Sequence, residues 1–293
     1  MKKFYALFLV IFVFFSLNHA FAKGGEDYCR QRNYDFNEDI EFTGNNEYKF
    51  NGRYFNEIKG KRVDSLDPFQ LLFVKNHEKE LAKKLSGDFD INSCGGPYDT
   101  SLLSLAATLG LIDDVKMIIN HGANLDSPKD SAGQSALMLA ISVGQYEIAN
   151  YLIKKGADIK TTTRHGHNAL HALAESINSE SRNKVLELDL ASTLISSGIP
   201  LNKKYENTIN GSTPLMLAII TDKPALVQLF MECGADPYIK NQRGRDSFDI
   251  AKTRDSFNAS KNIKRKESML DILQRPRPAS SSCNVHELSK STD

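Results

Sequence analysis

A unit of about 33 residues recurs along this chain and constrains its fold more than any other feature. The clearest copy, Gly211–Asp236, reads GSTPLMLAIITDKPALVQLFMECGAD. Thr213 is a good helix N-cap because its hydroxyl can accept a bond from an unpaired backbone N–H of the first turn. Pro214 then occupies the first helical position, where its missing N–H costs nothing. Since Gly234 supplies the left-handed residue that ends a second helix, each unit predicts two short helices joined by a turn.

Other segments repeat this pattern. Gly133–Asp158 and Asp99–Asn124 have the same length, and Gly166 and Gly244 each begin a further copy. The equivalent apolar anchors are spaced by 34, 33, 45 and 33 residues, and they are Leu103, Leu137, Leu170, Leu215 and Phe248. This period and the Thr-Pro-Leu start resemble the ankyrin-repeat family from about Asp67 to Arg275. The resemblance implies an all-α repeat solenoid, an ankyrin array of about six helix-turn-helix repeats.

The first 22 residues, Met1–Ala22, have the pattern of an export signal. Lys2 and Lys3 precede an apolar run, and Ala20-Phe21-Ala22 matches a small-residue cleavage site. The run is shorter than the roughly 20 residues that a spanning helix needs, although an uncleaved anchor is the alternative. We therefore expect a periplasmic or secreted protein with no integral membrane segment after cleavage. The usage of Lys, Asn and Ile suggests a bacterial source.

Three further regions complete the expected organisation. Residues 23–66 precede the repeats as an N-terminal cap, in which Glu47–Phe55 predicts a β-hairpin around Asn51-Gly52. Residues 67–275 form the repeat domain, whose closing repeat has a polar interruption at Arg254–Lys266. Residues 276–293 lack apolar periodicity and are expected to be a disordered tail.

The fourth repeat is expanded. From Leu170 to Gly198 is 28 residues, whereas the equivalent span in three other copies is 19. We expect the nine added residues near Ser176–Glu187 to lengthen the loop between the two helices. Val185, Leu186 and Leu188 are then expected to extend the second helix, pack partly on repeat five and offer the remaining surface to a partner.

Composition and motifs argue against several functions. Lys and Arg number 37 against 36 Asp and Glu, a formal net charge of +1, so a general nucleic-acid binder is not expected. No Gly-x-Ser-x-Gly, phosphate-binding glycine loop or His-Glu-x-x-His occurs, and we expect neither an enzyme nor a cofactor. His165, His167 and His171 invite a metal interpretation. We favour a structural role for His171 and an exposed position for the other two, because a metal site needs three or four convergent ligands.

Four cysteines are present, and in an oxidising compartment they would tend to pair. Cys29 in the cap and Cys94 between repeats one and two are a plausible disulfide. Four free thiols are the alternative, with Cys233 partly packed and Cys283 in the tail.

The family resemblance implies a monomeric protein-binding scaffold that presents turn tips and first-helix faces. The candidate tip residues are Tyr98, Thr100, Gln134, Arg164, His165, His167, Asn210, Ser212, Arg243 and Arg245. The adjoining first-helix positions are Thr108, Ser142, Glu175 and Thr221. Two functions compete: an adaptor that protects or neutralises a periplasmic enzyme, and a secreted effector that binds a protein of another cell. A third, an enzyme hidden in the N-terminal region, is disfavoured because only about 40 residues are available there.

Overall fold

A computed structural model describes residues 40–42, 48–50, 61–96, 100–126, 130, 132–176, 181–205, 211–261 and 267–275, with side chains outside 40–42, 48–50 and 181–183. The chain divides into two compact units, Met1–Asp158 and Ile159–Asp293. Within the described residues the helices form six pairs, so the predicted all-α repeat solenoid is confirmed.

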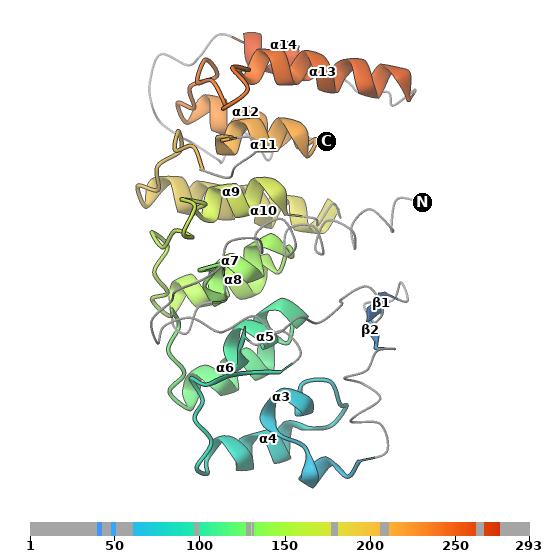
Figure 1. Cartoon of the computed structure of the whole chain (residues 1–293), viewed down its shortest axis with the longest axis vertical. Helices are drawn as coiled ribbons and strands as arrows, with labels where there is room; N and C mark the ends of the chain where they lie inside the picture. The colour runs from blue at the N-terminus through green and yellow to red at the C-terminus, as the bar shows by residue number, and fades with distance from the viewer. Residues whose placement is uncertain are drawn as a thin grey trace. The chain divides into compact units, whose positions relative to one another are not determined.

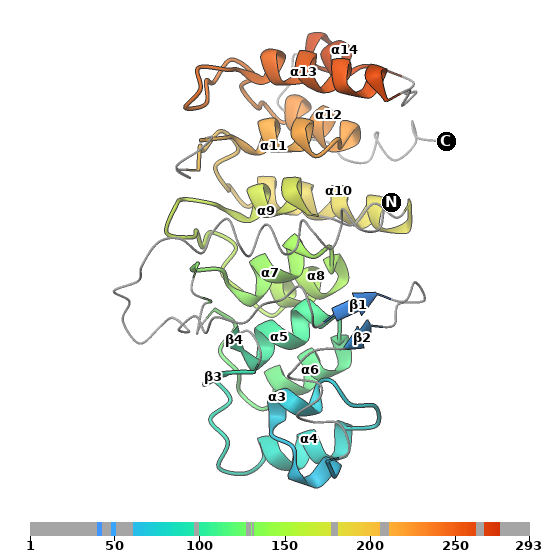
Figure 2. The same ribbon diagram turned by 45° about the vertical axis from the view of Figure 1, so that its right-hand side comes forward.

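The first unit contains three helix pairs. They are α3 (Pro68–Leu71) with α4 (Glu78–Leu85), α5 (Leu102–Leu109) with α6 (Ile112–Asn120), and α7 (Ala136–Ser142) with α8 (Tyr146–Lys154). First helices pack on first helices and second on second, α5 against α7 and α6 against α8 (Figures 1 and 2). Ser101 and Ser135 cap α5 and α7 by accepting backbone N–H bonds with their hydroxyls.

The second unit also contains three pairs. They are α9 (Ala169–Glu175) with α10 (Ser181–Ser196), α11 (Pro214–Ile220) with α12 (Pro224–Glu232), and α13 (Ser247–Ser260) with α14 (Met269–Gln274). The predicted helix N-cap at Thr213 is present, since its hydroxyl accepts a bond from the Met216 N–H and Pro214 begins α11. Leu215, 1% exposed, and Phe230, fully buried, lie in the apolar core between these helices.

The expanded fourth repeat has a longer second helix. Helix α10 has 16 residues, whereas α6, α8 and α12 have nine each. The predicted extension of the second helix is therefore confirmed. Helix α10 packs on α12 of the following repeat, and Glu187 of the extension accepts a bond from Lys223 at the start of α12.

Two predictions need correction. Strand β2 (Tyr48–Phe50) pairs antiparallel with the preceding β1 (Ile40–Phe42), with Glu41 opposite Lys49. The expected two-stranded hairpin is thus present, but Tyr48–Phe50 pairs with the apolar-charged-apolar segment before it, and the predicted turn at Asn51-Gly52 lies outside the described residues. A second short ladder joins β3 (Cys94–Gly95) to β4 (Thr100–Ser101).

The second correction concerns the closing repeat. The expected polar interruption begins inside α13, which continues to Ser260 and has 14 residues. Asp255 of α13 joins the two helices of this repeat, because its carboxylate accepts bonds from the Met269 and Leu270 N–H groups in the first turn of α14. The polar sequence at the end of the array is therefore helical as far as Ser260.

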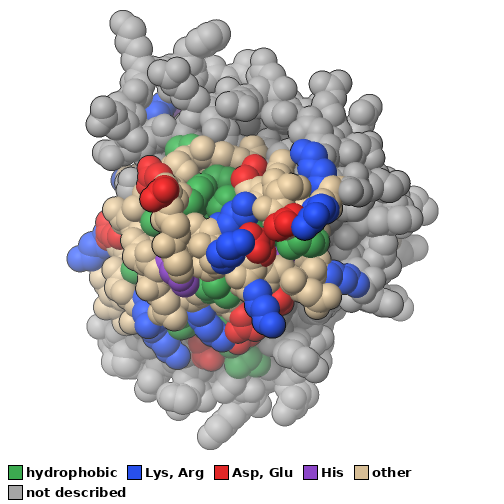
Figure 3. All heavy atoms as spheres, turned by 90° about the horizontal axis from the view of Figure 1, so that it is seen from below, with side chains coloured by type: hydrophobic (Ala, Val, Ile, Leu, Met, Phe, Trp, Pro, Cys, Tyr) green, Lys and Arg blue, Asp and Glu red, His purple; other side chains and the backbone are tan. Residues whose placement is uncertain are grey.

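The end of the first unit that carries α4 shows basic and acidic side chains interspersed (Figure 3). Helix α4 itself alternates them, with Glu78, Lys79, Glu80, Lys83 and Lys84. No single sign of charge dominates this end of the unit.

Candidate partner-binding surface

Each repeat is joined to the next through a tight turn, which we call a tip. The tip amides of Asp130, Thr163 and Asn241 donate to the carbonyls of Gln134, His167 and Arg245 at 3.1, 2.9 and 2.9 Å. A glycine precedes the last residue of each tip, with φ of 86° at Gly133, 79° at Gly166 and 71° at Gly244. These left-handed backbones let the chain reverse, which is why glycine recurs there.

The first side chain of each tip also holds the turn. Asp130 Oδ1 accepts from the Ala132 and Gln134 N–H groups at 3.0 and 2.7 Å. Asn241 Oδ1 accepts from Arg243 and Arg245 at 2.9 and 3.1 Å. Sequence reasoning missed these turn-forming residues, although Asp or Asn three residues before glycine is a recognisable turn signal.

Side chains also link consecutive repeats within each unit. In the first unit, Asn92 Oδ1 accepts from the Asn124 N–H at 2.8 Å, and Asp126 Oδ1 accepts from Asp158 at 2.9 Å. In the second, Asn202 Oδ1 accepts from the Asp236 N–H at 2.8 Å. These bonds fix neighbouring tips relative to one another, so each unit presents a preorganised row of turns.

The predicted tip residues separate by their position relative to the glycine. Arg164 and Arg243, which precede it, are exposed, and His165 is half-buried. Residues after the glycine turn inward. The expectation that they are exposed was wrong for Gln134 (1% exposed), His167 (2%) and Ser212 (0%), whereas Arg245 is half-buried. Thr100 is also buried, and Tyr98 and Asn210 lie outside the described residues.

The reason for the burial of His167 is a polar aromatic cluster in the second unit. His167 Nε2 lies 3.1 Å from Glu175 Oε2, and the His167 and His171 rings are 5.1 Å apart. Tyr205 packs edge-on against both rings at 5.3 and 5.6 Å. Burial, and after it the neighbouring His167, hold the pKa of His171 well below its usual value. Within the described ranges, no three His, Cys, Asp or Glu residues converge as metal ligands.

The first-helix positions are half-buried, and each is engaged within the chain. Thr108 and Ser142 donate to the carbonyls four residues before them at 2.8 and 3.0 Å. Thr221 Oγ1 donates to the Ala174 carbonyl at 2.7 Å and so joins repeats four and five. These three hydroxyls therefore bond to backbone carbonyls of the array itself.

The chain is similar to known repeat models over both units. The model "Ankyrin repeats (3 copies)" matches residues 71–163, and the single "Ankyrin repeat" model matches residues 210–242. The chain belongs to the ankyrin-repeat family. Ankyrin repeats imply a protein-binding scaffold, so the coarse functional prediction stands.

Relatives of this ankyrin protein occur in bacteria. It is 31% identical over 143 residues to an ankyrin repeat-containing protein of Treponema pallidum, covering 49% of this chain and 44% of the relative. It is 27% identical over 132 residues to an ankyrin repeat protein of Rickettsia felis, covering 45% and 41%. The phosphocholine transferase AnkX of Legionella pneumophila is 27% identical over 168 residues, which are 57% of this chain and 17% of AnkX. The chain thus spans less than half of each of these relatives, too little to carry over their activities.

The expanded ankyrin repeat contributes a buried ionic network. Lys223, which immediately precedes α12, places its Nζ 2.6 Å from Glu187 Oε1 of α10 and 2.6 Å from Ser176 Oγ. It also donates to the Leu173 carbonyl at 2.8 Å. Desolvation lowers the pKa of Lys223, and the Glu187 carboxylate opposes that shift. Val185, two residues before Glu187 on α10, is 54% exposed.

Cys94 in the first unit and Cys233 in the second are each disulfide-bonded. Cys29 lies outside the described residues, so its pairing with Cys94 stays a prediction. Within the described part of the chain, no helix has the length and apolarity needed to cross a bilayer.

Proposed function

We propose that this chain is an exported ankyrin scaffold that binds a partner protein through its turn tips. The row of fixed tips carries the proposal. Hydrogen bonds from backbone N–H groups to Asp and Asn side chains fix these turns in the absence of a partner. A preorganised row of turns loses little conformational entropy on binding, which favours recognition of a folded partner or an extended segment.

Export is supported by the signal pattern of Met1–Ala22 and by the disulfide-bonded state of Cys94 and Cys233, since disulfides persist mainly in oxidising compartments. A periplasmic destination would suit an adaptor that protects or neutralises an enzyme. Release from the cell would suit an effector that acts on another cell. The two differ in where the partner resides.

The experiment is affinity capture with the mature full-length protein, using periplasmic extract and, in parallel, culture supernatant of the source cells. The binding constant of each captured protein is then measured for wild type and for Arg164→Ala with Arg243→Ala, since both residues are exposed on tips. Lys252→Ala, exposed on α13, is the matched control. A partner whose affinity falls only in the tip variant supports the proposal. A partner that binds all three proteins equally overturns it.

A further inference from the structure

The tip edge of the second unit carries several cations around one exposed aromatic ring. We call this set the basic edge and define it as Lys203, Lys204, Tyr238, Lys240, Arg243 and Arg245. Lys204, Lys240 and Arg243 are exposed, Lys203 and Arg245 are half-buried, and Tyr238 is 67% exposed. Tyr238 has the largest exposure among the large hydrophobic side chains of the described residues.

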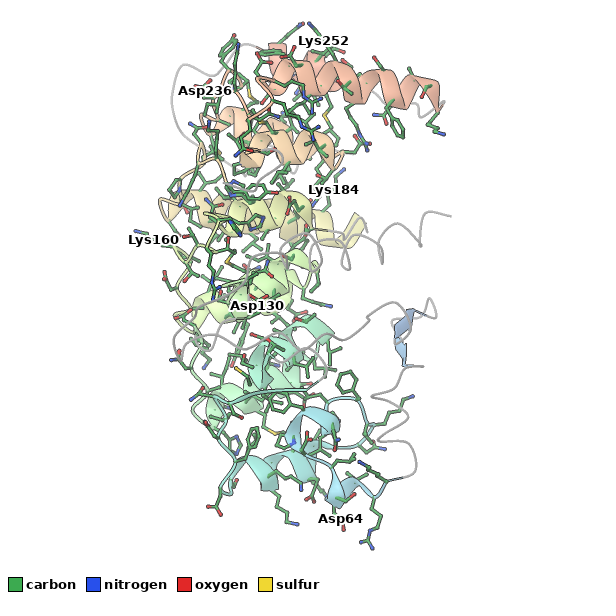
Figure 4. The ribbon with its side chains drawn as sticks, in the orientation of Figure 1. Asp64, Asp130, Lys160, Lys184, Asp236 and Lys252 are labelled. Carbon is green, nitrogen blue, oxygen red and sulfur yellow. The ribbon has the colours of Figure 1, made fainter. Side chains whose placement is uncertain are left out.

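Contacts across consecutive repeats bring these residues together. Lys204 Nζ donates to the Lys240 carbonyl at 3.3 Å, which joins two neighbouring loops. Gly211 lies so close to Gln242 that an added Cβ would come within 2.8 Å of its side chain, so the tip before repeat five touches the tip before repeat six. The Tyr238 ring rests on Phe248 of α13 with centroids 5.4 Å apart. Figure 4 shows Lys160 and Asp236 at this side of the second unit and Lys184 at the other.

The positive charge of the basic edge is not neutralised within the described residues. None of its five cations belongs to an ion pair there, whereas Lys223 and Arg254 of the same unit pair with Glu187 and Asp222. Two described acids close to these residues in sequence serve the backbone, and Glu206 lies outside the described residues. Asp236 Oδ1 accepts from the Tyr238 N–H at 2.9 Å, and Asp246 caps α13.

The first unit differs at the equivalent positions. There the tip and the inter-repeat link use Asp130 and Asp126, which bring negative charge with their hydrogen bonds. In the second unit Asn241 and Asn202 make the same kinds of bond without a charge. Asp130 and Asp126 of the first unit therefore have neutral counterparts in Asn241 and Asn202 of the second.

We infer that the basic edge is the docking site for an acidic polypeptide segment of the partner, an inference that rests on the proposed scaffold function. Such a segment would place carboxylates against Lys204, Lys240 and Arg243 and an apolar side chain against the Tyr238 ring. Arginine and tyrosine are the side chains that most often carry interface energy. Nucleic acid is the less favoured occupant, because the whole chain has a net charge of only +1.

The test measures binding of a fluorescein-labelled peptide of about 16 residues, rich in Glu with one central Leu, to the full chain by fluorescence anisotropy. The same peptide with Gln in place of Glu, and an oligothymidylate of equal charge, are measured in parallel. The site variant is Lys204→Gln with Lys240→Gln and Arg243→Gln. The control variant is Lys79→Gln with Lys83→Gln and Lys154→Gln, which removes equal charge from exposed positions of the first unit.

We expect the Glu peptide to bind, the Gln peptide to bind at least about tenfold more weakly, and salt to weaken the Glu complex. The site variant and Tyr238→Ala should each weaken it about tenfold or more, and the control variant less than about twofold. Equal losses in the two triple variants, absence of peptide binding, or tighter binding of the oligothymidylate would overturn the inference. If a captured native partner keeps its affinity for the site variant but loses it for the tip variant, the basic edge fails while the scaffold function stands.

Discussion

Lys223 and Glu187 form a buried ion pair with 2.6 Å between Nζ and Oε1, and their side chains are 12% and 9% exposed. The pair joins the lengthened second helix of repeat four to the start of α12 in repeat five. Removing one member of a buried pair typically costs about 3–5 kcal/mol, whereas replacing both with apolar residues is often neutral. The ion pair therefore ties the lengthened α10 to repeat five, and we expect the stability of the second unit to depend on it.

Lys223→Met should lower the free energy of unfolding by about 3–5 kcal/mol, because it removes the cation from a buried carboxylate. The double change Lys223→Met with Glu187→Leu should recover most of that loss. Urea unfolding followed by circular dichroism measures both. Lys184→Met on the exposed side of α10 is the control, and a Lys223→Met protein as stable as this control would contradict the prediction.

The first unit should be more stable at mildly acidic than at alkaline pH, because of His77. Both ring nitrogens face acceptors, with Nδ1 beside the Val74 carbonyl and Nε2 3.0 Å from both oxygens of Asp114. Burial lowers the pKa of His77, but the hydrogen bond and charge of Asp114, with the Val74 bond and Glu78, outweigh it and raise the pKa. Since the folded-state pKa is raised, the stabilisation is complete below the unfolded value of about 6.5 and is lost as pH rises through the folded value.

His77→Gln should therefore cost about 1.5–3 kcal/mol at mildly acidic pH, and less above the folded pKa. Urea midpoints measured across that range for wild type and variant give the comparison. His121→Gln, at an exposed histidine of the same unit, should leave the pH profile unchanged. A wild-type profile that is flat, or that rises with pH, would count against the charged pair.

Leu215→Ala should destabilise the second unit by about 2–5 kcal/mol, because it empties a core position shared between repeats. Ile220→Ala on the same helix is the control, since Ile220 is 42% exposed and its truncation should cost less than about 1 kcal/mol. Thermal melts compare the two variants. Equal melting temperatures would mean that the repeat register is wrong.

Val185→Asp should weaken binding of a captured partner while leaving the melting temperature within a few degrees of wild type, because the side chain is 54% exposed. A variant lacking Ile177–Asn183, a segment that ends three residues inside α10, should likewise keep most of its helical circular dichroism, because Lys184 onward stays in place and shortening a loop changes its closure entropy only slowly. Unchanged partner affinity in both variants would leave the expanded repeat as a tolerated insertion.

The exported protein should begin at Lys23, because Ala20 and Ala22 are the small residues that signal peptidase selects. Intact mass spectrometry of the exported fraction decides the matter. A mass that retains Met1–Ala22 would instead favour a membrane-tethered form.

The repeat helices could be predicted from sequence because their signals are local. Thr213, Pro214 and Gly234 act within a few residues of the helix ends that they set, and the structure places the ends there. The inward turn of His167 could not be predicted in the same way, since Tyr205 of the next repeat covers it. The pairing of Lys223 with Glu187 could not be predicted from local signals either, because the two residues are 36 positions apart in sequence.

The hydrogen bonds between repeats have an evolutionary consequence. Each uses a side-chain oxygen that Asp and Asn share, as Asp126 and Asn202 illustrate. A single base change that exchanges these residues would alter the electrostatic character of a tip while preserving its backbone. Duplicated repeats could thus acquire new binding preferences without first losing their ability to stack.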